Sequence, residues 1–267
     1  MDSQTSDIEQ QRRLVASLQD PALYPHPVKG FEVVQTHISW LLLTGDFVYK
    51  LKKPVDLGFL DFSTLAKRQH CCEEELRLNR RTAPDLYREV VPITGTPETP
   101  VLNGTGPVLE YAVKMAQFPH GALLNERLQE NRLTRANIDA LARTVADFHA
   151  RAARATADAP YGTPEAVWEP VEENFRQIRE RMGDTTTLDT LTAIERWNRA
   201  RLTGLRDCFS QRREQGFVRE CHGDLHLGNI ALIDGRPTPF DCIEFNPNLR
   251  WIDVISEVAF LTMDLED

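Results

Sequence analysis

Apolar positions change their spacing near residue 115 of this 267-residue chain. Before that point, short apolar runs are separated by turn signals, a pattern typical of strands. Strands are expected at residues 33–36, 38–43, 47–51, 90–93 and 108–115, with a long turn over residues 94–107. Helices are expected at residues 7–19 and from Ser63 or Thr64 to about Thr82. The pattern predicts a sheet with an embedded helix over residues 1–115.

Beyond residue 115, apolar positions recur at three- and four-residue intervals, the spacing of helices that bury one face. Helices are expected near residues 138–148, 168–178, 188–202 and 254–261, with Thr134 capping the first and Asp253 the last. Residues 230–233 and 238–240 flank the turn signal Asp234-Gly235, which predicts a hairpin. The chain is therefore expected to be α+β, with a β-rich front lobe, residues 1–115, and a mainly helical lobe, residues 116–267.

Composition narrows the class of protein. The chain is 41% hydrophobic and 27% charged, which is ordinary for a globular protein. With 40 acidic and 31 basic residues its formal charge is -9, which argues against nucleic acid as a partner. No apolar run approaches the length of a membrane span, and the N-terminus has no signal-peptide pattern. The five cysteines form no C-x-x-C pair, so we expect a reduced, cytoplasmic setting and no membrane partner.

The most informative segment contains Asp224, Asn229 and Asp241. With His222, it has the form H-x-D-x-x-x-x-N of a kinase catalytic loop, and Asp241 begins an Asp-Cys-Ile segment where a metal-binding D-F-G is expected. In phosphoryl transfer from Mg-ATP, one carboxylate accepts the proton of the attacking hydroxyl. An amide oxygen and a second carboxylate bind the metal ions. An isolated Asp- and Gly-rich segment is usually a turn. Three spaced elements on a predicted hairpin favour catalysis or nucleotide binding.

The sequence resembles the aminoglycoside phosphotransferase family, within the protein-kinase-like fold, over nearly its whole length. His-Gly-Asp-Leu-His-Leu-Gly-Asn at residues 222–229 is close to that family's catalytic loop, and also to that of choline kinases. Residues 48–54, 58–63 and 78–87 resemble one bacterial branch, whose members are often fused to a C-terminal P-loop ATPase domain. No G-x-x-x-x-G-K-[ST] motif occurs in this sequence. The chain ends where the family usually continues with more helices, so we expect a shortened protein or a fragment.

The resemblance implies a two-lobed protein-kinase-like fold and ATP and Mg²⁺ as cofactors. It implies that Asp224 is the catalytic base, or the group that orients the substrate hydroxyl. Asn229 and Asp241 would ligate Mg²⁺ through oxygen atoms, and His222 would brace the loop. His226 is expected to face either substrate or solvent.

The ATP-binding lysine of such a fold lies on the third strand and pairs with a glutamate of the following helix. Lys50 is our choice, because Val48 and Lys50 share a face of that strand, and Lys52 is the alternative. A lysine here could equally be a solvated edge charge. The helix partner is expected to be Glu75, with Glu74 as the alternative.

Two further groups are implied in nucleotide binding. The turn that would cover the phosphates, residues 36–40, contains no glycine, so we expect backbone N–H groups and the Ser39 hydroxyl to contact phosphate. Met115 falls where a hinge strand would be, and backbone groups of residues 115–117 are expected to bond the adenine. Acidic residues such as Glu257 and Asp264 are interpreted as solvated helix charges or packing partners rather than ligands of a cationic substrate.

Three functions are compatible with the sequence. The intact set of Asp224, Asn229 and Asp241 favours an ATP-dependent phosphotransferase with a small hydroxylated molecule as acceptor. The missing glycine loop favours a weakly active or inactive nucleotide-binding module that regulates a partner P-loop ATPase. A protein kinase is less favoured, since the D-F-G phenylalanine and the A-P-E motif are absent.

Overall fold

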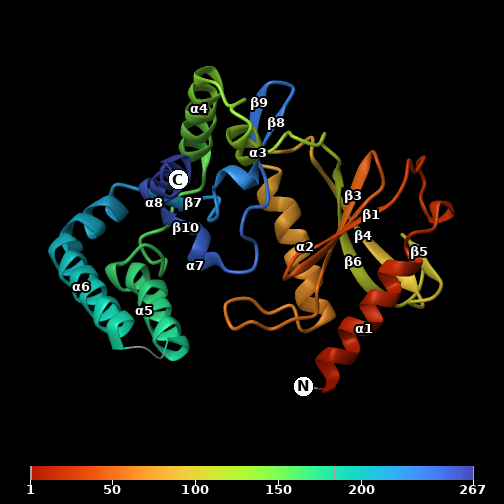
Figure 1. Ribbon diagram of the computed structural model, residues 1–267, viewed down its shortest axis with the longest axis horizontal. Helices are drawn as coiled ribbons and strands as arrows, with labels where there is room; N and C mark the ends of the chain where they lie inside the picture. Colours follow the sequence, from red (N-terminus) through yellow and green to blue (C-terminus); the bar gives the residue numbers. More distant parts are fainter. Residues whose placement is uncertain (1, 183–184, 267) are drawn as a thin grey trace. The chain divides into compact units, whose positions relative to one another are not determined.

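The computed structural model describes residues 2–182 and 185–266 (Figure 1). Its fold is α+β, as the sequence pattern predicted. The chain forms two compact units, the first comprising Met1–Phe148 and Asp224–Pro247, the second His149–Gly223 and Asn248–Asp267. Residues 224–247 thus belong to the same compact unit as the N-terminal sheet. The sequence pattern instead assigned them to the helical lobe, residues 116–267. That lobe boundary stays a prediction.

One antiparallel sheet organises the first unit. Among the described residues it has six strands, which in spatial order across the sheet are β1 (Glu32–Gln35), β2 (Ser39–Leu43), β3 (Phe47–Lys52), β6 (Val108–Ala116), β4 (Tyr87–Gly95) and β5 (Pro100–Leu102). The prediction of a turn over residues 94–107 was wrong in part, because Thr94 and Gly95 extend β4 and β5 pairs with them. A three-residue edge strand that begins with proline resembles a turn in sequence.

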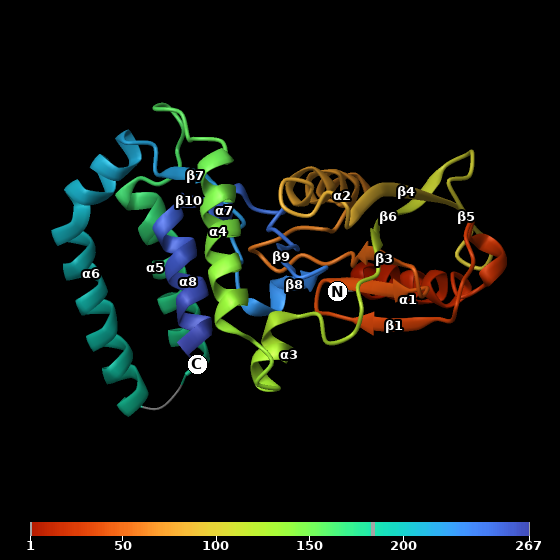
Figure 2. The same ribbon diagram turned by 90° about the horizontal axis from the view of Figure 1, so that it is seen from above.

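Helices α1 (Asp2–Ser17) and α2 (Leu65–Asn79) pack with different residues of the same strand. Successive residues of a strand face opposite sides of a sheet. Tyr49 and Leu51 of β3 join the core cluster that contains Leu14 of α1. Lys50 and Lys52 therefore point to the other face, where α2 runs beside β4 and β6 (Figure 2). The Tyr-Lys-Leu-Lys alternation thus places two lysines on one side of the sheet.

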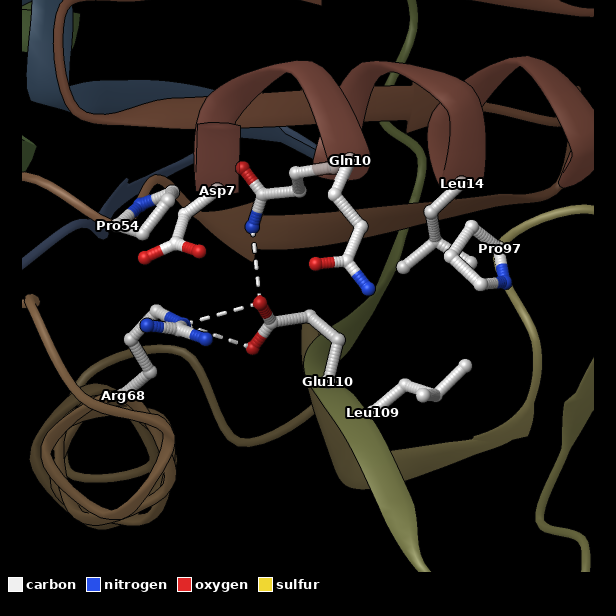
Figure 3. A pocket seen from close by; sticks show the side chains of 9 residues that line it. Asp7, Gln10, Leu14, Pro54, Arg68, Pro97, Leu109 and Glu110 are labelled. Carbon is white, nitrogen blue, oxygen red and sulfur yellow. Dashed lines mark hydrogen bonds and ion pairs between the residues drawn. The ribbon is translucent and has the colours of Figure 1, made fainter. Parts of the chain in front are cut away.

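A buried polar group anchors α1 to this sheet. Arg68 of α2 donates its Nε hydrogen to both carboxylate oxygens of Glu110, at 3.0 and 2.9 Å (Figure 3). Gln11 of α1 donates to Glu110 at 2.9 Å and to the carbonyl of Lys52 at 2.8 Å. Burial raises the pKa of Glu110, although Arg68 acts in the opposite direction. A cavity of about 80 Å³ beside these groups is too small for a nucleotide.

The helix ends follow their capping residues. Thr64 Oγ1 accepts from Lys67 N at 3.3 Å, which makes Thr64 rather than Ser63 the cap of α2. Thr134 accepts from Asn137 N at 3.2 Å at the start of α4 (Arg135–Arg151). Asp253 accepts from Ile255 N at 3.0 Å at the start of α8 (Val254–Glu266). The predicted caps at Thr134 and Asp253 are therefore confirmed, and of the two candidates for α2 the cap is Thr64.

The remaining elements complete the two units. They are η1 (Pro21–Leu23), α3 (Leu124–Gln129), α5 (Pro164–Arg181), α6 (Thr185–Glu214), β7 (Val218–Glu220), η2 (Leu227–Asn229), β8 (Ile230–Ile233), β9 (Arg236–Pro239), α7 (Pro247–Arg250) and β10 (Trp251–Asp253). β8 and β9 form the predicted hairpin, and β7 pairs antiparallel with β10. None of the described helices is both long enough and apolar enough to cross a membrane.

Candidate active site

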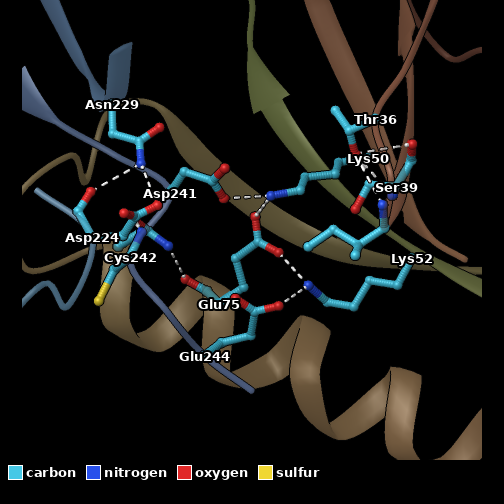
Figure 4. Close-up of polar contacts among 12 residues, drawn as sticks. Thr36, Ser39, Lys50, Lys52, Glu75, Asp224, Asn229, Asp241, Cys242 and Glu244 are labelled. Atoms are coloured by element: carbon cyan, nitrogen blue, oxygen red, sulfur yellow. Dashed lines mark hydrogen bonds and ion pairs between the residues drawn. The ribbon is translucent and has the colours of Figure 1, made fainter. Parts of the chain in front are cut away.

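Two lysines of β3 share one buried carboxylate (Figure 4). Lys50 Nζ donates to Glu75 Oε1 at 2.9 Å, and Lys52 Nζ donates to Glu75 Oε2 at 2.6 Å. The Glu75 side chain is fully buried, with 0% exposure. Glu74 instead pairs with Arg77 of the same helix, at 2.8 Å. The expected pair of Lys50 and Glu75 is present, and the alternative, Lys52, contacts the same glutamate.

The Asp241 segment lies against the same lysines. Asp241 Oδ1 accepts a hydrogen bond from Lys50 Nζ, which thus bridges Asp241 and Glu75. Asp241 has φ +62°, a left-handed conformation that is uncommon for residues other than glycine. Two side chains hold this backbone: Tyr87 Oη accepts from Asp241 N at 3.1 Å, and Asn79 Oδ1 accepts from Cys242 N at 2.9 Å. Strained backbone of this kind persists where its surroundings fix it, and often marks functional sites.

Asn229, one of the two predicted metal ligands, contacts the predicted base Asp224 and the residue before the other ligand, Asp241. Its Nδ2 donates to the carbonyl oxygen of Asp224 at 3.0 Å and to Asp224 Oδ2 at 3.1 Å. Phe240 N donates to the carbonyl of Asn229 at 2.9 Å, so the hairpin joins Asn229 to the residue before Asp241. The amide oxygen of Asn229 and the carboxylate of Asp241 are hard oxygen donors, the kind that Mg²⁺ prefers. The donor set therefore fits a magnesium ion.

Glu244 completes the charged cluster, and sequence reasoning missed it. Its Oε1 accepts from Lys52 Nζ, and its side chain is 5% exposed. Burial raises the pKa of Glu244. Burial disfavours charged Lys50, but Asp241, Glu75 and Glu244 outweigh that effect and hold its pKa well above the usual value of 10.5. The only sequence signal for Glu244 was a charge within the run Cys-Ile-Glu-Phe.

The glycine-free turn after β1 is internally bonded. Thr36 Oγ1 accepts from Ile38 N at 3.3 Å and from Ser39 N at 3.0 Å. These two N–H groups, which were expected to contact phosphate, are therefore already engaged. The Ser39 hydroxyl is buried and has no hydrogen-bond partner within the described part of the chain. Ser39 pairs in register with Lys52, on the face that carries the lysines.

The predicted hinge lies at the end of β6. Met115 is buried in a cluster that Val48 and Phe240 pack against. The N–H groups of Ala116 and Gln117 donate to the carbonyls of Leu86 and Asp46, at 2.8 and 2.9 Å. These two N–H groups are engaged within the chain, so an adenine contact from this segment needs other backbone groups.

His222 and Gly223, which precede Asp224 in the chain, are held by a buried carboxylate of the second unit. Glu257 Oε1 accepts from their backbone N–H groups at 2.6 and 2.8 Å. The interpretation of Glu257 as a helix-packing partner fits better than that of a solvated charge, since it is 2% exposed. Gly223 has φ +89°, and a Cβ there would lie 2.8 Å from the carbonyl of Leu249. This is the physical reason for glycine in the His-Gly-Asp motif.

Glu257 also bonds His149, with 2.6 Å between Oε2 and Nε2. Burial would raise the pKa of Glu257, but His149, the charge of His222 and the Gly223 N–H outweigh burial and lower it. With Cys221, these two residues form a buried group of potential metal ligands. Both Glu257 oxygens already accept hydrogen bonds, which favours a structural role. The bracing role of the His222 side chain stays a prediction.

The sequence model of the phosphotransferase enzyme family matches residues 100–258. The chain belongs to this family. Membership implies a kinase-like fold and a kinase-like transferase activity. The matched range contains Asp224, Asn229 and Asp241, whereas Lys50 and Glu75 lie outside it.

Two curated relatives are uncharacterized proteins. They are Rv2004c of Mycobacterium tuberculosis (strain ATCC 25618 / H37Rv) and Mb2027c of Mycobacterium bovis (strain ATCC BAA-935 / AF2122/97). Each is 31% identical over 244 residues, covering 90% of this chain and 47% of the relative. The chain thus spans about half the length of the curated relatives it matches.

Proposed function

We propose that this phosphotransferase-family chain transfers the γ-phosphate of ATP to a hydroxyl group of a small molecule, with Mg²⁺ as cofactor. The observation that carries the proposal is the bridge from Glu75 through Lys50 to Asp241. It joins the strand lysine, the helix glutamate and the metal-binding carboxylate that phosphoryl transfer uses. A cytoplasmic setting belongs to the same proposal, since ATP is available there.

Each side chain has a distinct task in this proposal. Asp224 accepts the proton of the attacking hydroxyl, or orients that hydroxyl, while Asn229 Nδ2 fixes its carboxylate. Asn229 and Asp241 would hold Mg²⁺, which when bound neutralises charge on the phosphate oxygens. Lys50 is charged and buried, and it would exchange Asp241 for a phosphate oxygen. Glu75 orients Lys50 for that exchange.

One observation favours a second function, a nucleotide-binding module that regulates a partner ATPase. The N–H groups of Ile38 and Ser39 bond Thr36 and are not presented to a phosphate. A turn without glycine is also less able to rearrange. The relatives are about twice as long as the aligned region, which leaves room for a further domain such as a P-loop ATPase. This module would bind Mg-ATP with little turnover.

Thermal unfolding with Mg-ATP tests the binding that both functions require. We expect Mg-ATP to raise the melting temperature of the wild type, because a ligand that binds the native state stabilises it. Asp241→Asn should abolish most of that rise. Asp234→Asn is a matched control, since it makes the same change at another positive-φ residue, at the tip of the same hairpin. No rise in the wild type would contradict nucleotide binding altogether.

Turnover separates the two functions. We expect slow Mg-dependent ATP hydrolysis by the wild type, reduced about 100-fold or more in Asp224→Asn, the lower end for loss of a general base. The Mg-ATP melting shift should remain, since Asp224 is not a proposed metal ligand. Binding without any hydrolysis or transfer to hydroxylated acceptors would favour the regulatory module. Hydrolysis that persists unchanged in Asp224→Asn would overturn the assigned role of Asp224.

A further inference from the structure

Lys52 and Glu244 form a contact that the proposed reaction has not used. The Lys52 side chain is 1% exposed, and its ammonium bridges Glu244 Oε1 and Glu75 Oε2. It also lies 5.0 Å from the ring centroid of Phe62. Phe62 in turn packs edge-on against Phe245, with centroids 6.2 Å apart. An ion pair and an aromatic contact thus attach the segment after Asp241 to β3 and the loop that follows it.

Several contacts of different chemical character fix this segment. Tyr87 and Asn79 hold the backbone of residues 241 and 242 through neutral hydrogen bonds. Lys52 holds the segment three residues after Asp241, through the charge of Glu244. Each attachment restricts where the Asp241 carboxylate can lie. The Lys52 contact connects the segment to the strand that carries Lys50, in addition to the hydrogen bond from Lys50 to Asp241 itself.

Lys50 and Lys52 both pair with Glu75, but they have different roles. Lys50 has to leave Asp241 if Asp241 is to bind a metal and Lys50 a phosphate. Were Lys50 the sole partner of Glu75, its movement would leave a fully buried carboxylate uncompensated, which is costly. Lys52 keeps Glu75 Oε2 and Glu244 paired during that exchange. The network can therefore release Lys50 without losing its geometry.

We propose that Lys52 and Glu244 are positioning residues, whose ion pair holds the Asp241 segment in the metal-binding position while Lys50 moves to the nucleotide. The inference rests on the proposed function, since it assigns Asp241 to Mg²⁺. Lys52 is then a fixed cation, distinct from the mobile cation Lys50. Partners that orient metal ligands in this way commonly change metal affinity by 10- to 100-fold when they are replaced.

The test is the Mg²⁺ dependence of the ATP-induced melting shift in Glu244→Gln. At saturating ATP, we expect the Mg²⁺ concentration for half the maximal shift to rise about tenfold or more. At saturating Mg²⁺, the ATP concentration for half the maximal shift should change less than about threefold, because Lys50 and the hinge are untouched. ATP hydrolysis should show the same split, with a larger effect on the Mg²⁺ requirement than on the KM for ATP.

Two further variants sharpen this test. Glu89→Gln is the matched control, because Glu89 pairs with Lys114 of β6 at 3.0 Å on the same sheet, and we expect no change in either titration. Lys52→Met should raise the Mg²⁺ requirement as well, although it also removes a partner of Glu75. Adding Glu244→Gln to it should raise the requirement little more, since both changes break the Lys52–Glu244 pair. If the effects of Lys52→Met and Glu244→Gln on the Mg²⁺ requirement were fully additive, the two residues would not act through their ion pair.

The outcomes separate this inference from the proposed function. A wild type that shows no Mg-ATP shift overturns both. A wild type that responds, together with a Glu244→Gln variant whose Mg²⁺ dependence is unchanged, overturns the positioning role alone. Glu244→Asp supplies a second test if Glu244→Gln fails to fold, because it keeps the charge and shortens the side chain. A raised Mg²⁺ requirement in Glu244→Asp supports the role, and an unchanged one overturns it.

Discussion

Glu75 and Glu257 are both buried carboxylates, but the two units of the molecule stabilise them in different ways. Glu75 accepts hydrogen bonds from two ammonium groups of β3. Glu257 accepts from two backbone N–H groups just before Asp224 and bonds the ring of His149. Two ammonium charges neutralise the first carboxylate, whereas the His149 ring and two peptide N–H groups satisfy the second.

The difference shows which part of a site each carboxylate can control. An ammonium group at the end of a flexible side chain can exchange one oxygen for another, so the Glu75 network can orient Lys50 and still release it. A backbone N–H cannot move without moving the chain. Glu257 therefore fixes the main chain that leads into Asp224. Glu75 is thus paired with movable charges, whereas Glu257 is bonded to backbone groups that cannot move independently of the chain.

The largest expected effect comes from Glu75→Gln. Neutralising this side chain leaves two buried lysines with one charge partner fewer, and breaking a buried ion pair costs about 3–5 kcal/mol. We expect a loss of about 3 kcal/mol in the free energy of unfolding, measured by urea denaturation with tryptophan fluorescence. Glu74→Gln is the control, one position earlier in α2, where Glu74 pairs with Arg77 near the surface. It should change the free energy by less than about 1 kcal/mol.

A smaller loss is expected from Glu257→Gln. The glutamine keeps one acceptor oxygen, but its NH₂ group faces either the two backbone donors or His149, so one polar contact is lost. An unsatisfied buried group costs about 1–3 kcal/mol, and we expect about 2 kcal/mol in the same urea experiment. Glu173→Gln on α5, which removes a surface ion pair with Arg176, should change the free energy of unfolding much less than Glu257→Gln does. A loss equal to that of Glu75→Gln would mean that charge, rather than hydrogen bonding, dominates at Glu257.

Much of the candidate site could be predicted because its parts have local signals. Alternation along β3 placed Lys50 and Lys52 on one face, and the hairpin signal brought Asn229 toward Asp241. Spacing along the helix could not separate Glu74 from Glu75, since only the packing of α2 on the sheet decides which one is buried. The structure shows that Glu75 is the one that faces β3.

The contacts that hold the site were not predictable in the same way. Glu244 meets Lys52 across 192 positions, and Asn79 meets Cys242 across 163. Such pairs are set by tertiary packing and leave no periodic pattern in the sequence. The segment of residues 78–87 resembles one bacterial branch of the family. Its Asn79 and Tyr87 now have a physical explanation, as the side chains that hold the backbone of the Asp241 segment.

The comparison of the two carboxylates also predicts a pH dependence, which is the smallest effect. The pKa of Glu257 lies below its usual value of 4.5, so its ionised form stabilises the fold fully above about pH 4.5. That contribution is lost as the pH falls through the lower pKa of the folded state. The difference in unfolding free energy between wild type and Glu257→Gln should therefore shrink as the pH falls below about pH 4.5. Urea denaturation at each pH measures it. A difference that instead grows below about pH 4.5 would mean that the buried carboxylate is protonated more easily in the folded state, and that its histidine and peptide N–H partners do not offset its burial.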